Sequence, residues 1–322
     1  MTQAVGEVTG APNPRESLQF RNRLRQGLPL LLDGATGTEL NRRGVDTGLP
    51  MWSAKALLDA PDVLLAIHRD YVLAGAEIIT ANTFRTNRRS LAATGFAGEA
   101  GMLTTRAVEL ARDAIGEAMS GRSGDGEVHI AGSIAPLEDC YSPDLVPDTE
   151  TLAVEHYEMV AVLVSAGADL LLVETMNTIR EATVAAEIAV ATGLPVLVSF
   201  VCGRDGNLLS GEGIREAADR VARCGVDALL INCAPAADLH VGLASLAAAT
   251  DLPIGAYGNV GYADDVQGWV NTDSVDPQAY AIHADRWLDI GARVIGSCCG
   301  TGPAHSEVLR ARIDARAFPH VQ

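Results

Sequence analysis

The feature that most constrains the fold is an alternation of short aliphatic runs with longer segments of helical period. Eight runs are predicted as strands, at residues 29–33, 77–80, 128–132, 170–174, 196–200, 228–232, 253–256 and 293–296. The clearest helical segments between them are residues 61–74, 102–119, 149–166, 178–191 and 214–224. Parallel strands need long crossover connections and are buried on both faces, so this pattern is typical of a parallel sheet covered by helices.

Eight such units closing on themselves predict an α/β fold, a single (β/α)8 barrel, for which a chain of 322 residues is long enough. The alternative is an open doubly wound sheet, which has fewer units and usually a glycine-rich phosphate turn. No turn of that form follows residues 29–33. We expect the barrel domain to span residues 27–322. The polar residues 1–26 are predicted to be a flexible N-terminal tail.

Composition narrows the class of partner and the compartment. The net charge is −17, which repels phosphate backbones and anionic lipid, so neither nucleic acid nor a membrane is an expected partner. The N-terminus lacks the apolar core of a signal peptide, and six cysteines in a chain of this length do not form a disulfide-scaffold pattern. A cytoplasmic location is expected. Three of the cysteines, Cys140, Cys202 and Cys224, show no metal-like spacing and are predicted to be ordinary thiols.

The other three cysteines follow predicted strands. Cys233 ends the sixth run, and Cys298 and Cys299 come after the last run, between Gly296 and Gly300. Adjacent side chains on a strand point to opposite faces, so both thiols reach one point only if the chain bends there, which the glycines permit. Three thiols at strand ends suit a catalytic zinc ion with one open position. A vicinal disulfide and buried free thiols remain the alternatives.

Two acids also end apolar runs. In barrels of this kind the active site lies at the C-terminal ends of the strands, where Asp33 and Glu174 are placed. They form either a buried salt bridge or a pair of carboxylates that holds a substrate ammonium group. The small-residue turn at residues 34–38 offers backbone N–H groups suited to a carboxylate. Together with a metal bound by thiolates, these groups suggest an amino acid that carries sulfur.

Four segments resemble one family, in order from about Leu30 to Ala315. They are Asp33-Gly34-Ala35-Thr36-Gly37-Thr38-Glu39, Ala81-Asn82-Thr83-Phe84, Ile231-Asn232-Cys233 and Gly296-Ser297-Cys298-Cys299-Gly300-Thr301. The chain is similar through them to the homocysteine S-methyltransferase family. Ser297 and Gly258 depart from the residues usual in that family, which affects the expected loop geometry and removes no ligand.

The resemblance implies a site and a role for each matched residue. The catalytic zinc ion (Zn2+) would be held by Cys233, Cys298 and Cys299. Asp33 and Glu174 would lie near the substrate amino group, and the Gly34 and Ala35 backbone near its carboxylate. The further residues expected at the substrate are Asn82, Asn232 and Asn259, the last also near the metal.

The implied reaction moves a methyl group from a sulfonium donor, S-methylmethionine or S-adenosylmethionine, to the zinc-bound thiolate of homocysteine. The product is methionine, so the expected role is in methionine biosynthesis, with homocysteine and a small methyl donor as partners. Trp52 and Tyr257 are candidates for cation–π contact with the sulfonium, or else for packing. The oligomeric state is not predicted.

Other readings remain open at this point. The donor is alternatively betaine-like or a methyl-cobalamin partner subunit, and the acceptor another thiol or a selenol. The short stretch after the eighth unit disfavours built-in folate or cobalamin modules. Outside this class, the chain is a metal-dependent hydrolase or lyase, or a non-catalytic barrel that binds zinc or thiols.

Overall fold

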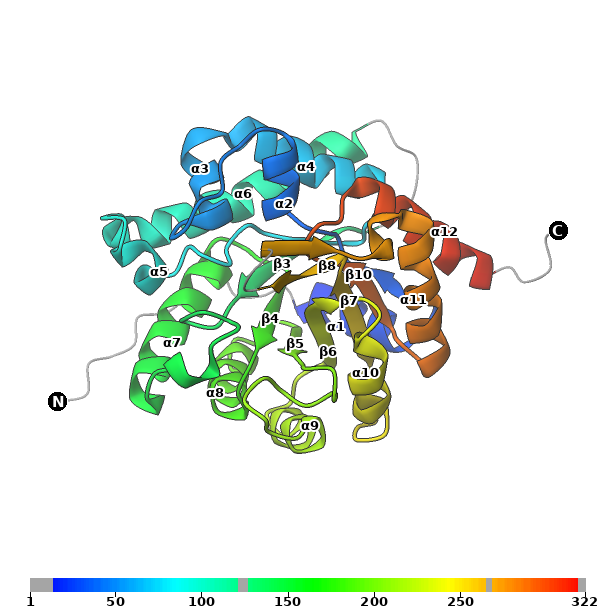
Figure 1. Cartoon of the computed structure of the whole chain (residues 1–322). Coiled ribbons are helices and arrows are strands. Elements are labelled where there is room, and N and C mark those ends of the chain that lie inside the picture. The colour runs from blue at the N-terminus through cyan, green and yellow to red at the C-terminus, as the bar shows by residue number, and fades with distance from the viewer. Residues whose placement is uncertain (1–13, 121–126, 265–267, 318–322) are drawn as a thin grey trace.

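The computed structural model describes residues 14–120, 127–264 and 268–317, and its centre is a parallel barrel (Figure 1). The eight-stranded sheet has the order β1-β10-β7-β6-β5-β4-β3-β2. A parallel bridge between Leu32 and Ile78 closes it, with hydrogen bonds from Glu77 N to Leu31 O (2.8 Å) and from Asp33 N to Ile78 O (3.0 Å). The predicted (β/α)8 barrel is confirmed.

Each barrel strand begins at its predicted first residue or one residue later. The strands are β1 (Leu30–Leu31), β2 (Ile78–Thr80), β3 (His129–Ile134), β4 (Leu170–Met176), β5 (Val196–Val201), β6 (Ala228–Pro235), β7 (Ile254–Asn259) and β10 (Val294–Ser297). Side chains alternate across the wall: Leu170 and Leu172 fill the barrel interior, whereas Leu171 and Val173 pack under the helices. Burial on both faces explains the uninterrupted aliphatic runs.

Helices surround the barrel (Figure 1). They are α2 (Gly37–Arg42), α3 (Ala56–Asp59), α4 (Pro61–Leu73), α5 (Arg88–Ala92), α6 (Ala100–Met119), α7 (Thr149–Ser165), α8 (Ile179–Val190), α9 (Ile214–Ala222), α10 (Leu239–Ala247), α11 (Pro277–Ile290) and α12 (Pro303–Ala317). Short 3-10 turns occur at Trp52–Lys55, Ala97–Glu99, Pro143–Leu145 and Asp273–Val275. Within the described residues, no helix combines the length and apolar character that crossing a membrane requires.

Local sequence sets the helix ends, as α11 illustrates. The Asp276 side chain accepts a hydrogen bond from Ala279 N, and Pro277 occupies the first turn, where a missing N–H costs nothing. The helix ends at Gly291, whose φ of 108° lies in the left-handed region that glycine adopts without strain. This glycine punctuation made the helix–strand boundaries predictable.

The N-terminal segment differs from the flexible tail expected over residues 1–26. Pro14–Arg25 forms helix α1, which lies behind the strands near the centre of Figure 1. Phe20 and Leu24 are buried in the same cluster as the interior strand residues, and the Phe20 ring meets the His129 ring edge-on at 5.0 Å. These few apolar side chains give the otherwise charged helix its packing. Residues 1–13 lie outside the described residues, so a flexible tail stays a prediction for them.

A hairpin across the barrel mouth was also missed. The strands β8 (Gly261–Asp264) and β9 (Gly268–Asn271) pair antiparallel between the strands predicted at residues 253–256 and 293–296, where the sequence predicts no further strand. Val260, just before the hairpin, donates its backbone N–H to Cys299 O at 3.0 Å. The hairpin therefore starts from the segment that carries the paired cysteines.

Gly296 is needed for close strand packing, and the chain leaves the strand after Ser297, just before the paired cysteines. Gly296 lies inside β10, where a Cβ would stand 2.8 Å from Leu32 Cβ and 3.0 Å from Leu32 O. The left-handed residue in this segment is Gly300, with φ 85°. We expect Gly296→Ala to lower the free energy of unfolding by about 1–3 kcal/mol, because the added methyl is forced into the wall.

Denaturant unfolding followed by circular dichroism measures this change. The matched control is Gly116→Ala on the exposed side of α6, where a Cβ meets nothing within 4 Å. That substitution should be neutral or stabilising by up to about 1 kcal/mol, because alanine is the better helix former. Equal stability of Gly296→Ala and the parent would contradict the packing argument.

Candidate active site

A cavity of about 330 Å³ opens at the C-terminal ends of the barrel strands. Eight of the sequence-predicted site residues line it: Asp33, Gly34, Ala35, Asn82, Glu174, Cys233, Cys298 and Cys299. Asn232 and Asn259 are not among the described residues that line the cavity. The site is therefore where barrel topology predicts it.

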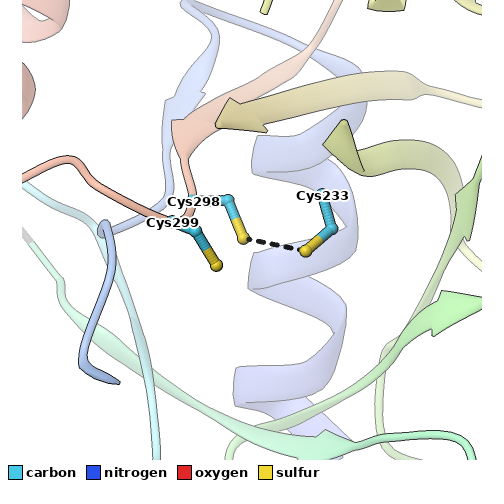
Figure 2. A group of neighbouring side chains, drawn as sticks. All are labelled: Cys233, Cys298 and Cys299. Atoms are coloured by element: carbon cyan, nitrogen blue, oxygen red, sulfur yellow. Dashed lines mark hydrogen bonds between the residues drawn. The ribbon is translucent and has the colours of Figure 1, made fainter. Parts of the chain in front are cut away.

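Three thiols that line this cavity lie next to one another (Figure 2). The Sγ atoms of Cys233, Cys298 and Cys299 all lie within 4.8 Å of one another, and those of Cys233 and Cys298 are 3.6 Å apart. Zinc–sulfur bonds of about 2.3 Å in a tetrahedron place sulfur atoms about 3.8 Å apart. The three thiols are thus close enough together to share one metal ion. All six cysteines are free, so the vicinal disulfide is absent.

Cys233 reaches the cavity through an unusual backbone conformation. Strand parity would direct its side chain outward, because Ala228 and Leu230 of the same strand face the barrel interior. The register between β6 and β7 shifts after Asn232, and Cys233 has φ 58°. Left-handed backbone is costly for a residue with a Cβ and is found mostly at functional sites. Here it turns the thiol back toward the cavity.

Asn232 supports this irregular backbone. It is fully buried, and its amide oxygen accepts hydrogen bonds from Ser199 Oγ (2.7 Å) and Thr175 N (3.2 Å). Its amide nitrogen donates to Thr175 Oγ1 at 2.8 Å. Thr175 follows Glu174 and also has a positive φ, 61°. Asn232 therefore fixes the backbone beside both Glu174 and Cys233.

The paired cysteines are held by residues of other motifs. Asn259 Oδ1 accepts a hydrogen bond from Cys299 N at 3.0 Å, and Thr38 Oγ1 accepts one from Gly300 N at 2.9 Å. After the larger effects of the Cys298 and Cys299 thiols, the Asn259 side chain also helps to lower the pKa of Cys233. Asn259 thus lies beside the three thiols, as expected.

The three thiols shift one another's pKa values through hydrogen bonds. The pKa of Cys233 lies well below its ordinary value, first because its sulfur accepts hydrogen bonds from the Cys298 and Cys299 thiols. The pKa values of Cys298 and Cys299 are raised, chiefly because each holds its proton in a hydrogen bond to Cys233. A cation between the three sulfur atoms would replace those protons.

The two acids lie in the cavity wall. Asp33 is 2% exposed, and its carboxylate accepts hydrogen bonds from Thr80 N and Thr80 Oγ1, both at 2.8 Å. Glu174 is 7% exposed and accepts hydrogen bonds from Ser133 Oγ and from Tyr257 OH, the latter at 3.2 Å. Burial raises the pKa of Asp33 to about 8 and that of Glu174 to about 7. The alternative of a buried salt bridge is wrong within the described residues, because neither acid has a cationic partner there.

The backbone of the turn after the first strand already forms hydrogen bonds within the protein. Ala35 N donates to Thr301 Oγ1 at 3.2 Å, and Ala35 O accepts a hydrogen bond from Tyr71 OH at 2.9 Å. In this conformation the Ala35 amide is not available to a substrate carboxylate. Asn82 lines the cavity with its amide nitrogen donated to Ser53 O at 2.8 Å, which ties the two rim segments together.

Arg85, Tyr141 and Trp269 are among the cavity residues that sequence reasoning missed. Tyr141 OH lies 3.0 Å from Cys233 Sγ and 3.1 Å from Cys233 O, so this tyrosine braces the left-handed cysteine. The available signal was its place after the strand predicted at residues 128–132, on the face where barrel topology predicts the active site. Nothing in its spacing singled out Tyr141.

Comparisons of the sequence and the structure with known proteins point to one family. The sequence profile described as homocysteine S-methyltransferase matches residues 30–313. Homocysteine S-methyltransferase of Escherichia coli (strain K12) is 32% identical, covering 88% of this chain and 94% of that protein. Selenocysteine methyltransferase of Astragalus bisulcatus is 31% identical, covering 86% and 90%. The metallated form of the E. coli homocysteine methyltransferase MmuM superposes with a TM-score of 0.80 at 32% identity, covering 93% of this chain and 100% of that one.

Proposed function

The chain belongs to the homocysteine S-methyltransferase family, and we propose that it methylates homocysteine to methionine with a sulfonium donor. The observation that carries this proposal is the convergence of three thiols on the cavity that also holds two buried acids. The thiols suit a soft metal that binds the acceptor sulfur, and the acids suit the acceptor ammonium group. Metal-dependent hydrolases and lyases normally use histidine or carboxylate ligands, and no histidine is among the described residues that line this cavity.

We propose zinc as the metal, held by Cys233, Cys298 and Cys299. Thiolate ligands select zinc over hard cations such as magnesium, and three protein ligands leave one position for a substrate atom. When bound, the ion would lower the pKa of the acceptor thiol, which in water is about 8.5, so that it is a thiolate at neutral pH.

Asp33 and Glu174 are proposed to bind the acceptor's ammonium group. Burial raises the pKa of each carboxyl, and neither carboxyl has an ion-pair partner among the described residues. An ammonium group would supply that cation and favour ionisation of both acids. Ser133 and Tyr257 hold Glu174 from the other side through their hydroxyl groups, so its carboxylate is oriented before the substrate arrives.

The transfer itself needs alignment and little further chemistry. The acceptor sulfur forms a bond to the donor methyl carbon while the bond from that carbon to the donor sulfonium breaks. The bonding electrons pass to the donor sulfur, which leaves as a neutral thioether. With the metal present, the acceptor would bind as a thiolate and its proton would pass to solvent, so no side chain would be required as a general base. Holding the two sulfur compounds in line supplies much of the rate enhancement.

Aromatic side chains in the cavity favour a sulfonium donor. Trp52, Phe84 and Trp269 all line it, and the Trp52 and Phe84 rings meet edge-to-face at 5.7 Å. Ring faces attract cations that are poorly hydrated, such as a sulfonium. Tyr257 instead uses its hydroxyl on Glu174 and is buried, so we assign it to the acceptor side.

A selenol is a second acceptor candidate. Relatives named selenocysteine methyltransferase are as similar to this chain as those named homocysteine S-methyltransferase. The same thiolate-bound metal would bind a selenolate, which is also soft. Competition between homocysteine and selenocysteine for methyl groups would decide which acceptor the site prefers.

Removal of the metal tests the proposal. With homocysteine and S-methylmethionine as substrates, we expect chelator-treated protein to form methionine at least about 100-fold more slowly, because metal-site losses are of that order or larger. One equivalent of Zn2+ per chain should restore the rate. Methionine is measured by mass spectrometry and metal content by elemental analysis, with protein dialysed without chelator as control. An unchanged rate after zinc removal would disprove the proposed mechanism.

A further inference from the structure

Arg85 stands apart from the other groups that line the cavity. It follows Phe84 on the loop after β2. Among the lining residues that the structure describes, it is the sole lysine, arginine or histidine. The other ionisable groups there are the acids Asp33, Asp139 and Glu174, together with the thiols and Tyr141 and Tyr257. The cavity therefore has one permanently cationic group in its wall.

This guanidinium has no anionic partner within the described part of the chain. Its Nε is buried without a hydrogen-bond partner, and its Cζ lies 5.9 Å from the centroid of the Phe84 ring. Two arginines on the same segment behave differently. Arg88 pairs with Glu158 at 3.0 Å, and Arg89 pairs with Glu138 at 2.9 Å and also with Glu155. Arg85 thus differs from the other two arginines of its segment in having no acidic side chain paired with it among the described residues.

A partly buried cation without a partner favours an anionic guest. A guanidinium offers a planar fork of N–H donors that matches a carboxylate, and a bond to a charged group is stronger than one between neutral groups. Arg85 also lies next to the aromatic surface assigned to the sulfonium, since Phe84 contacts both Arg85 and the Trp52 ring. A carboxylate held by Arg85 would therefore belong to the compound whose sulfonium lies against these rings.

We propose that Arg85 binds the carboxylate of the methyl donor and so selects amino-acid sulfonium compounds over simple alkyl sulfonium compounds. This rests on the proposed function and names its donor class. In S-methylmethionine, three carbon atoms separate the sulfonium from the carboxylate carbon. The two charged groups of such a donor are thus close enough to engage neighbouring residues. The acceptor's ammonium remains with Asp33 and Glu174.

The test compares two donors in three proteins. The donors are S-methylmethionine and (3-aminopropyl)dimethylsulfonium, which lacks the carboxylate. For the parent we expect a donor KM about 10- to 100-fold higher for the second compound, the range of one hydrogen-bonded charge pair. Arg85→Gln should raise the KM of S-methylmethionine by the same factor and leave that of the second compound unchanged. Arg85→Lys should fall between, because it keeps the charge and loses the fork.

The matched control is Arg88→Gln, an exposed arginine of the same segment that pairs with Glu158. It should leave both donor KM values unchanged. In Arg85→Gln the homocysteine KM and the melting temperature should also be unchanged. An equal rise in KM for both donors, or a rise in the homocysteine KM instead, would overturn the assignment.

Donor binding is measured separately from turnover by calorimetry with S-methylmethionine alone. Tighter binding to the parent than to Arg85→Gln supports the assignment even if homocysteine proves not to be the acceptor. Equal binding to both proteins contradicts it even if homocysteine is methylated. The outcome for Arg85 is therefore distinguishable from the outcome for the proposed function.

Discussion

Replacing Cys298 with serine is expected to remove the metal and lower the rate of methyl transfer at least about 100-fold. Losing even a residue that only hydrogen-bonds a metal ligand can lower metal affinity or activity by about that factor, and Cys298 is itself a proposed ligand. A serine hydroxyl stays protonated at neutral pH and is a poor match for zinc beside two sulfur ligands. Cys233→Ser should behave alike, because its Sγ lies 3.6 Å from that of Cys298. The double variant should be no worse than either single variant, because each already removes the same ion.

Zinc content per chain and the rate of methionine formation are measured on the same samples. The matched control is Cys224→Ser, two residues after the end of α9, whose thiol lies outside the cavity and contacts Arg220 O at 3.6 Å. That protein should retain zinc and full activity. A Cys298→Ser protein with one zinc ion per chain and an unchanged rate would refute the assigned ligand set.

The barrel was predictable because its strands are buried on both faces and its helices end at glycines. The first residues of β4, β5 and β6 coincide with those predicted. Helix α1 and the β8–β9 hairpin were missed for the opposite reason. Each has few apolar residues, and each is stabilised by contacts with distant parts of the chain, such as that between Phe20 and His129. The pattern of residues within a segment does not predict contacts of this kind.

The sequence predicted which residues form the candidate site better than it predicted how they are arranged. Strand parity places Glu174 on the interior face with Leu170 and Leu172, so its position follows from sequence alone. The same rule directs Cys233 outward, and the left-handed backbone that turns it inward has no signal in the sequence. Arg85 was missed because it lies beyond a strand end and its distinguishing property is the absence of a partner nearby.

Replacing Glu174 with glutamine is expected to raise the KM of homocysteine about 10- to 100-fold while zinc remains bound. The amide keeps the shape of the carboxylate and its contacts to the Ser133 and Tyr257 hydroxyls, but it cannot neutralise an ammonium group. A hydrogen bond between charged groups contributes about 1.5–3 kcal/mol, which sets that range. Gln278→Glu on exposed α11 controls for the preparation. An unchanged homocysteine KM in Glu174→Gln would refute the role.

The pH dependence of acceptor binding gives this assignment a second, independent measurement. With pKa values of about 7 for Glu174 and about 8 for Asp33, both acids are largely protonated at pH 6 when no cation is bound. An ammonium group binds the ionised forms, so homocysteine affinity should rise from pH 6 to pH 8 as protons compete less for the two acids.

The same raised pKa values mean that these acids stabilise the unliganded fold at low pH, and that this contribution is lost as pH rises through 7 and 8. Homocysteine should therefore raise the melting temperature more at pH 8 than at pH 6. In Glu174→Gln, the change in homocysteine affinity near pH 7 should disappear and the change due to Asp33 should remain. An unaltered pH dependence of affinity would mean that ionisation of Glu174 does not control homocysteine binding.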